Sequence, residues 1–442
     1  MAESTVAAPR ELPSLFAPPL IGDSLAFLGD PAGFLKEHTD KLGRIFRINI
    51  FFEDVVCFIG PEAFKLFLDE KYFTRAQASP PHIAEILHPN AVPFLEDGAF
   101  KRRKELLMEI FKESALDGYA RILDQVMQRY ASNWEQRKSF AWVPELTAMA
   151  MSVAGSLFIG ADPAKDDKTI ADAFQTAFGG MLTLPINLPF TPYGKALKAR
   201  DFLRGKIAEA LQAHQAKPMD DAMAQAMAAR SKDGEKLSDE EICIETFHFF
   251  GAYVPVIGGL AFLMMCLGQN RDVLDKLRTE VREKLPSGPV TLARLRDLPY
   301  LDRVCKESRR VQPVLPITFF AKVKEECSFD GVRVPKGMKA VGCISPTLQD
   351  AAVYESPAKF DPDRWVNAGP PQQSAWVPHG GGQHLTAHRC AGEQLANLML
   401  KTFAVLMLRS YDWTFPPQDF SPTKGQLFAT PKGGLQVKLT RL

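Results

Sequence analysis

Three histidines and one cysteine lie close together in the sequence VPHGGGQHLTAHRCAG, which ends at Gly392. These residues are His379, His384, His388 and Cys390. Imidazole and thiolate are good ligands for zinc, so a zinc site formed by three or four of them is one interpretation. In the other interpretation Cys390 alone binds a metal, because a helix predicted to begin near Glu393 stabilises a thiolate through its free N–H groups and its dipole.

Two motifs upstream of this loop carry charged residues at helical and turn spacing. Glu307 and Arg310 share one face of a predicted helix in LDRVCKESRRVQP. The sequence FDPDRW follows and contains Arg364. Together with Cys390, in this order and spacing, these motifs resemble those of the cytochrome P450 haem-thiolate family. The resemblance implies a buried ion-pair network of Glu307, Arg310 and Arg364.

The same resemblance implies a haem b cofactor whose iron takes Cys390 as its axial thiolate ligand. It implies a mainly α fold with a small antiparallel β lobe, in one domain over residues 1–442. We expect the sheet-rich lobe to come from about 40–60, 315–345 and 425–440. Further contacts to the cofactor are expected from residues beside the ligand and from an upstream basic run. These are His388, Arg389, Gly392, Lys101 and Lys104.

The ligand loop departs from the usual pattern of the family. Gln383 and His388 stand where other members have a phenylalanine and a basic residue. The three consecutive glycines and the HRC segment are instead similar to the ligand loop of bacterial fatty-acid peroxygenases, which use hydrogen peroxide. Peroxide is therefore an alternative source of oxygen.

A long uncharged segment, Phe249 to Gly268, has the length of a membrane span. Ser238 to Glu241 form a capping box just upstream, which starts a helix that runs into this segment. We predict a core helix from Asp239 to Gly268 and no membrane span. Pro255 should distort it, since proline cannot donate a hydrogen bond to the carbonyl four residues earlier.

The resemblance places Ala252, Tyr253, Val254 and Pro255 above the iron as catalytic residues. Most members of the family carry an acid and an alcohol where this chain has Val254 and Pro255, and that pair guides protons during oxygen activation. The peroxygenases have arginine and proline there, and this chain keeps only the proline. Tyr253 and His248 are the nearest polar groups, and we expect both to make structural hydrogen bonds.

An apolar pocket for a small to medium substrate is expected beneath this helix, and the segment Phe73 to Phe94 should contribute to specificity. Its other predicted lining residues follow the predicted helix that carries Glu307 and Arg310, or lie in a predicted C-terminal hairpin. They are Leu315, Ile317, Thr318, Phe319, Phe428 and Ala429. Other predicted elements are a strand pair at 44–50 and 54–60 and helices at 61–69, 101–111, 116–135, 145–158 and 194–213.

Composition narrows the class of protein. The 442 residues are 46% hydrophobic, and 53 basic against 52 acidic residues give a net charge of +1, which argues against a nucleic-acid binder. Seven cysteines without CxxC spacing fit a reducing compartment. Because residues 1–20 show no signal-peptide pattern, we predict a soluble, cytoplasmic protein. We also expect it to be a monomer.

The resemblance implies a monooxygenase whose oxygen comes either from dioxygen with a ferredoxin-type electron donor or from hydrogen peroxide. Arg389 would offer a basic contact to such an acidic donor. A peroxygenase or a hydroperoxide-rearranging enzyme is the alternative within the family. A haem-binding protein without turnover and a zinc enzyme are alternatives of another class.

Overall fold

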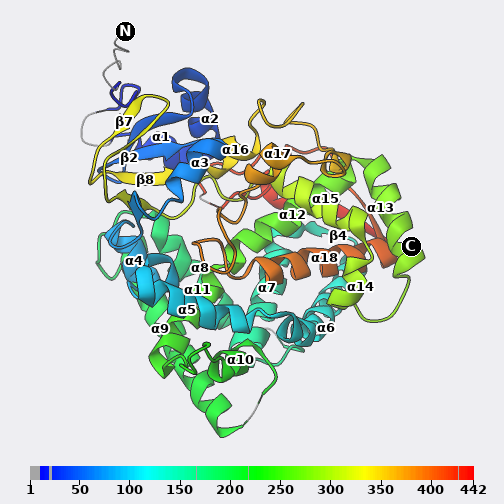
Figure 1. The fold of residues 1–442 in the computed structure, drawn as a ribbon. Coiled ribbons are helices and arrows are strands. Elements are labelled where there is room, and N and C mark those ends of the chain that lie inside the picture. The colour runs from blue at the N-terminus through cyan, green and yellow to red at the C-terminus, as the bar shows by residue number, and fades with distance from the viewer. Residues whose placement is uncertain (1–9, 19–21, 166, 218, 427) are drawn as a thin grey trace.

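In the computed structural model, a small β lobe and a larger helical body make up the protein (Figure 1). The structure describes residues 10–18, 22–165, 167–217, 219–426 and 428–442. Residues 1–9 and 19–21 belong to the amino-terminal segment in which we predicted no signal peptide, and they lie outside the described residues.

The β lobe is built on a five-stranded sheet whose strands come from both halves of the chain. In spatial order the strands are β1 (Ile45–Ile50), β2 (Glu53–Phe58), β8 (Lys339–Gly342), β5 (Ala321–Val323) and β3 (Phe73–Thr74). The predicted strand pair is confirmed, because β1 and β2 are antiparallel with Ile45 opposite Phe58. A separate hairpin consists of β6 (Cys327–Phe329) and β7 (Val332–Val334).

The carboxy-terminal strand β10 (Gln436–Arg441) lies in another sheet, so the prediction that 425–440 joins the β lobe is wrong. It pairs with β4 (Ser139–Ala141) and β9 (Tyr411–Thr414). The predicted hairpin is also absent, because Phe428 to Thr430 lie outside any strand. Alternating side chains predict a strand but do not specify which backbone it pairs with.

The predicted amphipathic helices of the first half are confirmed with shifted ends. They are α3 (Pro61–Phe67), α5 (Asp97–Ile110), α6 (Glu113–Arg137), α7 (Trp142–Phe158) and α9 (Pro192–Ala216). Further helices in this half are α1 (Ser24–Gly29), α2 (Pro31–Leu42), α4 (Pro81–Leu87), α8 (Lys168–Gly179) and α10 (Ala222–Ala228). The second half contains α13 (Arg271–Lys284), α14 (Leu292–Arg296), α15 (Pro299–Val311), α16 (Ile344–Leu348), α17 (Pro370–Ser374) and α18 (Glu393–Ser410). Short 3-10 turns are η1 (Val92–Phe94), η2 (Gly180–Leu182), η3 (Pro362–Trp365) and η4 (Lys432–Gly434).

The long apolar helix is present in two parts, α11 (Asp239–Gly251) and α12 (Tyr253–Gln269). The predicted capping box begins α11, since Ser238 Oγ accepts from the Glu241 N–H at 3.1 Å and the Glu241 carboxylate accepts from the Ser238 N–H at 2.9 Å. The helix breaks at Ala252, three residues before Pro255. The predicted distortion is therefore confirmed, because Pro255 has no N–H for the carbonyl of Gly251.

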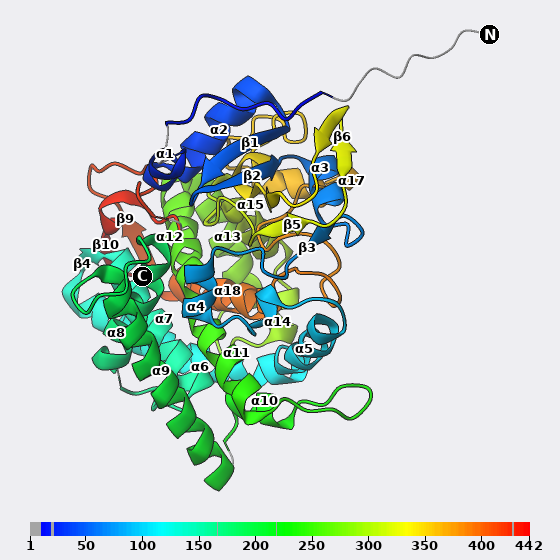
Figure 2. The same ribbon diagram turned by 90° about the vertical axis from the view of Figure 1, so that its left-hand side faces the viewer.

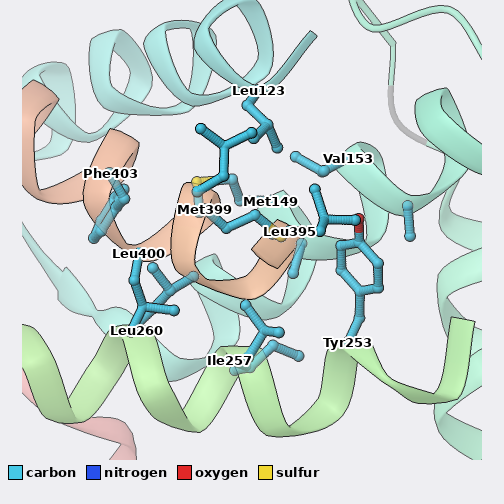
Figure 3. Close-up of a cluster of buried hydrophobic side chains, with 14 of the residues drawn as sticks. Leu123, Met149, Val153, Tyr253, Ile257, Leu260, Leu395, Met399, Leu400 and Phe403 are labelled. Atoms are coloured by element: carbon cyan, nitrogen blue, oxygen red, sulfur yellow. The ribbon is translucent and has the colours of Figure 1, made fainter. Parts of the chain in front are cut away.

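Asp239–Gln269 is, in the described part of the chain, the one helical stretch long and apolar enough to cross a membrane. However, 78% of the most apolar 18-residue stretch of this helix is buried inside the protein. Figure 2 shows α12 passing through the helical body. Side chains of α12, such as Ile257 and Leu260, pack against Leu395 and Met399 of α18 (Figure 3). This burial supports the prediction of a core helix.

Candidate functional site

A cavity of about 350 Å³ is lined both by the break between α11 and α12 and by the loop that carries Cys390. The residues around it are mainly aliphatic and aromatic. It brings together most of the predicted site. The predicted residues that line it are Ala252, Tyr253, Pro255, Leu315, Ile317, Thr318, Phe319, Phe428, Cys390, His388, Arg389, Gly392 and Lys104. The segment 73–94 contributes as predicted, for example through Ile83 and Val92.

Three predicted site residues do not line this cavity. Val254 packs half-buried against the main hydrophobic core, because its side chain leaves the helix in a different direction from that of Pro255. Ala429 also packs against the core, and its N–H donates to the carbonyl of Val314 at 2.9 Å. Lys101 is exposed and borders a smaller hollow of about 40 Å³. The cavity therefore gives no support to the predicted roles of these three residues, which stay predictions.

Cys390 differs from the other cysteines, because it is the one that lines the cavity, and its side chain is accessible from there. The residue stands just before α18, and the N–H of Gly392 hydrogen-bonds to its sulfur. Burial from bulk water raises the pKa of the thiol, while that N–H and the charge of Lys104 oppose the rise. The fold therefore places one N–H donor and one cation where both would stabilise negative charge on this sulfur.

The three histidines of the loop do not converge on one point. His379 Nε2 lies 2.7 Å from Nη1 of Arg309, and His384 Nε2 lies 3.1 Å from the carbonyl oxygen of Cys390. The ring of His388 stacks on Phe100 with 3.8 Å between centroids. Among the described residues, no group of three or more His, Cys, Asp or Glu could hold a metal ion. This arrangement does not support the zinc alternative.

Burial also keeps two of these imidazoles neutral. It lowers the pKa of His379 to about 3, and the charge of the neighbouring Arg309 contributes. It lowers the pKa of His388 to about 3, with contributions from Arg75 and Lys104. Neutral rings can therefore pack against the cavity without a counter-ion.

Two buried cations, Arg75 and Lys104, line the cavity, and only Lys104 was predicted from the sequence. The Nη1 of Arg75 donates to the carbonyl of Phe319 at 2.8 Å, and Lys104 Nζ donates to the carbonyl of Arg389. Burial lowers the pKa of Arg75 to about 10 and that of Lys104 to about 8. In the part of the chain that the structure describes, neither forms an ion pair with a carboxylate. No motif contains Arg75, so only its position in the segment 73–94 could have suggested it.

Burying a cation without a counter-charge costs free energy, so Arg75 and Lys104 fit a site for an anionic ligand. The two propionates of a haem are such a ligand, and the apolar walls suit its macrocycle. Cys390 on the same cavity supplies the thiolate that the iron requires. The residues present thus fit the cofactor that the resemblance implies.

The predicted ion-pair network is present, and Glu307 and Arg310 at its centre are fully buried. Arg310 Nε and Nη2 each donate to the carboxylate of Glu307 at 2.8 Å, and both side chains are 0% exposed. Arg364 Nε and Trp365 Nε1 donate to the same carboxylate at 2.8 and 2.9 Å. Arg310 also donates to the carbonyls of Leu348, Pro357 and Lys359. The network therefore joins α15 to the chain segment that precedes the ligand loop.

Arg389 is not free to meet an acidic electron donor. Its Nε and Nη2 atoms donate to the two carboxylate oxygens of Glu393 at 2.7 and 2.8 Å. This bidentate pair joins the ligand loop to the first turn of α18, so the predicted role of Arg389 in partner binding is not supported.

His248 and Tyr253, the two polar residues near the break between α11 and α12, differ in their contacts. His248 Nδ1 lies 3.2 Å from Glu245 Oε2, so its structural hydrogen bond is confirmed. The hydroxyl of Tyr253 has no hydrogen-bond partner among the described residues, so the same prediction for Tyr253 is wrong. Its ring reaches from α12 into a cluster with Leu395 and Val153 (Figure 3). Burial raises the pKa of this phenol.

Comparison with known proteins agrees with the motifs. The family model described as Cytochrome P450 matches residues 13–439. A protein of Synechocystis sp. described as putative cytochrome P450 120 is 30% identical over 437 residues, which is 97% of each chain. The solved structure of retinoic acid-bound cyanobacterial CYP120A1 has a TM-score of 0.89 at 30% identity, and covers 98% of this chain and 100% of its own. A variant of cytochrome P450SP alpha (CYP152B1) has a TM-score of 0.79 at 20% identity over 95% of this chain and 99% of its own, which shows a shared fold alone.

Proposed function

Because the chain belongs to the cytochrome P450 family, it is a haem-thiolate oxidising enzyme, and we propose that it is a monooxygenase acting on a small to medium apolar molecule. One oxygen atom of dioxygen enters a C–H bond of the substrate. Two electrons from a ferredoxin-type donor and two protons convert the other atom to water. The observation that supports this proposal is one mainly apolar cavity that is lined both by Cys390 and by the break between α11 and α12.

In this proposal the Cys390 thiolate would hold the haem iron, and Arg75, Lys104 and His388 would hold its propionates. Thiolate-ligated haem supplies the activation of oxygen when bound. The chain's own residues hold and orient the reactants. The N–H of Gly392 stabilises charge on the sulfur, and the aliphatic and aromatic walls exclude water and favour an apolar substrate.

Loss of either buried cation should weaken haem binding. We expect Arg75→Leu and Lys104→Leu each to speed the transfer of haem to apomyoglobin by about tenfold, since a charge-assisted hydrogen bond contributes about 1.5–3 kcal/mol. Lys101→Leu is the matched control, because that exposed lysine does not line the cavity. Equal transfer rates in all three variants would argue against this assignment.

The class of substrate is inferred from the residues that line the cavity. Phe178, Met181 and Phe249 are among the lining residues that present hydrocarbon to the ligand. Retinoic acid, which is bound in the cyanobacterial structure of 30% identity, is a reasonable first compound to test. Binding can be followed through the shift of the haem spin state.

A peroxide-driven reaction is the second candidate, and Val254 and Pro255 at the start of α12 favour it. Val254 and Pro255 carry no titratable group where most family members have the acid and the alcohol. A substrate found by spin-state screening should be turned over with hydrogen peroxide alone, and separately with dioxygen, ferredoxin and its reductase. We expect the reductase system to be faster by at least about tenfold, a barrier difference of about 1.4 kcal/mol. Faster turnover with peroxide would replace the monooxygenase by a peroxygenase.

That the protein is a soluble, cytoplasmic monomer without nucleic-acid partners stays a prediction. It is supported by burial of the apolar helix Asp239–Gln269 and by the balanced charge of the chain.

A further inference from the structure

One imidazole on the roof of the cavity is fixed by a buried carboxylate. His248 belongs to α11, one turn before Ala252, and lines the cavity with 19% of its side chain exposed. Its Nδ1 atom lies 3.2 Å from Oε2 of Glu245. The other two histidines of the cavity, His379 and His388, belong to the ligand loop. His248 is thus the histidine placed to meet a substrate below the helix.

Glu245 cannot turn away from His248, because its other oxygen is already bonded. This carboxylate is 1% exposed, and Oε1 accepts from Nη1 of Arg103 at 2.6 Å and from the N–H of Val92 at 2.9 Å. Arg103 in turn donates to Glu241 at 2.6 Å. The contacts join α11 to α5 and to η1, and they fix the orientation of the imidazole.

The hydrogen bond between Glu245 and Nδ1 of His248 determines the chemistry of Nε2, the other ring nitrogen. A carboxylate oxygen accepts, so the proton of a neutral imidazole is assigned to Nδ1, and Nε2 is left as an acceptor. Nε2 of His248 has no hydrogen-bond partner among the residues that the structure describes. An acceptor at the wall of an apolar cavity can bind the O–H of a ligand.

The charges around His248 distinguish an alcohol from an acid. Three carboxylates and two guanidinium groups are linked in its network, which leaves one negative charge in excess. They are Glu235, Glu241, Glu245, Arg102 and Arg103. A substrate carboxylate at Nε2 would add a second negative charge in a poorly solvated place, whereas a hydroxyl adds none.

We propose that His248 binds the hydroxyl group of an otherwise apolar substrate, which makes hydroxylated hydrocarbons the preferred class. This inference rests on the proposed function and specifies the substrate of the same site. Glu245 is the positioning residue, since it acts on the ligand only through the imidazole.

The test compares three probes of equal chain length in the haem-loaded protein. Dodecan-1-ol, dodecane and dodecanoate are titrated while the haem spin state is followed. The wild type should bind the alcohol about tenfold more tightly than the alkane, the effect of one hydrogen bond worth about 1.4 kcal/mol, and also more tightly than dodecanoate. His248→Phe should abolish the preference for the alcohol and change the affinity for dodecane less than about twofold.

Ser79 is the matched control, because this residue lines the same cavity and its buried hydroxyl has no hydrogen-bond partner among the described residues. Ser79→Ala should keep the preference for the alcohol. If His248→Phe does not fold, His248→Gln serves instead and should reduce the preference. The inference is overturned if the preference survives loss of the imidazole, disappears in Ser79→Ala, or is absent in the wild type.

Tighter binding of dodecanoate than of dodecan-1-ol would also overturn it, because the imidazole would then act as a cation. A carbon monoxide band near roughly 450 nm in each variant shows that the haem-thiolate centre is intact. Absence of this band from the wild type would contradict the proposed function itself. An intact band with an unchanged preference would contradict only the role of His248.

Discussion

Replacement of Cys390 by alanine should abolish the absorption band near roughly 450 nm of the reduced, carbon monoxide-bound protein. The band depends on a thiolate ligand to the haem iron. Cys390 is the cysteine whose sulfur lines the cavity, with an N–H from Gly392 and the charge of Lys104 beside it. Turnover should fall to background, since alanine offers no ligand for the iron.

The matched control for this experiment is Cys243→Ala, because Cys243 is partly exposed on α11 and does not line the cavity. The band should keep its position and height in that variant. A band that persists in Cys390→Ala would show that another residue is the ligand. Haem content, measured as the pyridine complex, separates loss of the ligand from loss of the cofactor.

The Glu307→Gln variant should lose about 3–5 kcal/mol of unfolding free energy, the usual cost of removing one partner of a buried ion pair. The carboxylate of Glu307 accepts from Arg310, Arg364 and Trp365, and it is 0% exposed. Glutamine keeps the shape but leaves two guanidinium groups without their counter-charge. Urea unfolding followed by far-ultraviolet circular dichroism measures the effect.

Glu326→Gln provides the control for a salt bridge at the surface. Glu326 pairs with Arg333 at 2.6 Å, but both side chains are about half exposed. Water screens such a pair, so its loss should change the unfolding free energy by less than about 1 kcal/mol. Comparable destabilisation in the two variants would contradict a structural role for the buried network.

The network also explains why the ligand loop stays in place. Glu307 accepts from the N–H of Asp361 at 3.0 Å, while Arg310 bonds to carbonyls between Leu348 and Lys359. Irregular backbone before the ligand loop is therefore held by a helix rather than by a sheet. Loss of the network should accordingly reduce haem content as well as stability.

Local patterns determined much of the site from the sequence alone. Glu307 and Arg310 are one helical turn apart, Ser238 and Glu241 cap α11, and a proline cannot donate to the carbonyl four residues earlier. The pairing of Arg389 with Glu393 also has the i, i+4 spacing that could have revealed it. Such features depend on near neighbours, which the order of residues specifies.

The tertiary structure decided the features that join distant segments. It assigned β10 to β4 and β9, brought Arg75 to the same cavity as Cys390, and placed Val254 against the core while Pro255 faces the cavity. It also joined Glu245 to Arg103 across α11 and α5. The sequence determines where a helix, cap or turn forms, because these depend on local backbone and side-chain energies. Which side chains share a cavity depends on how whole elements pack, and that packing is set by the burial of the entire core.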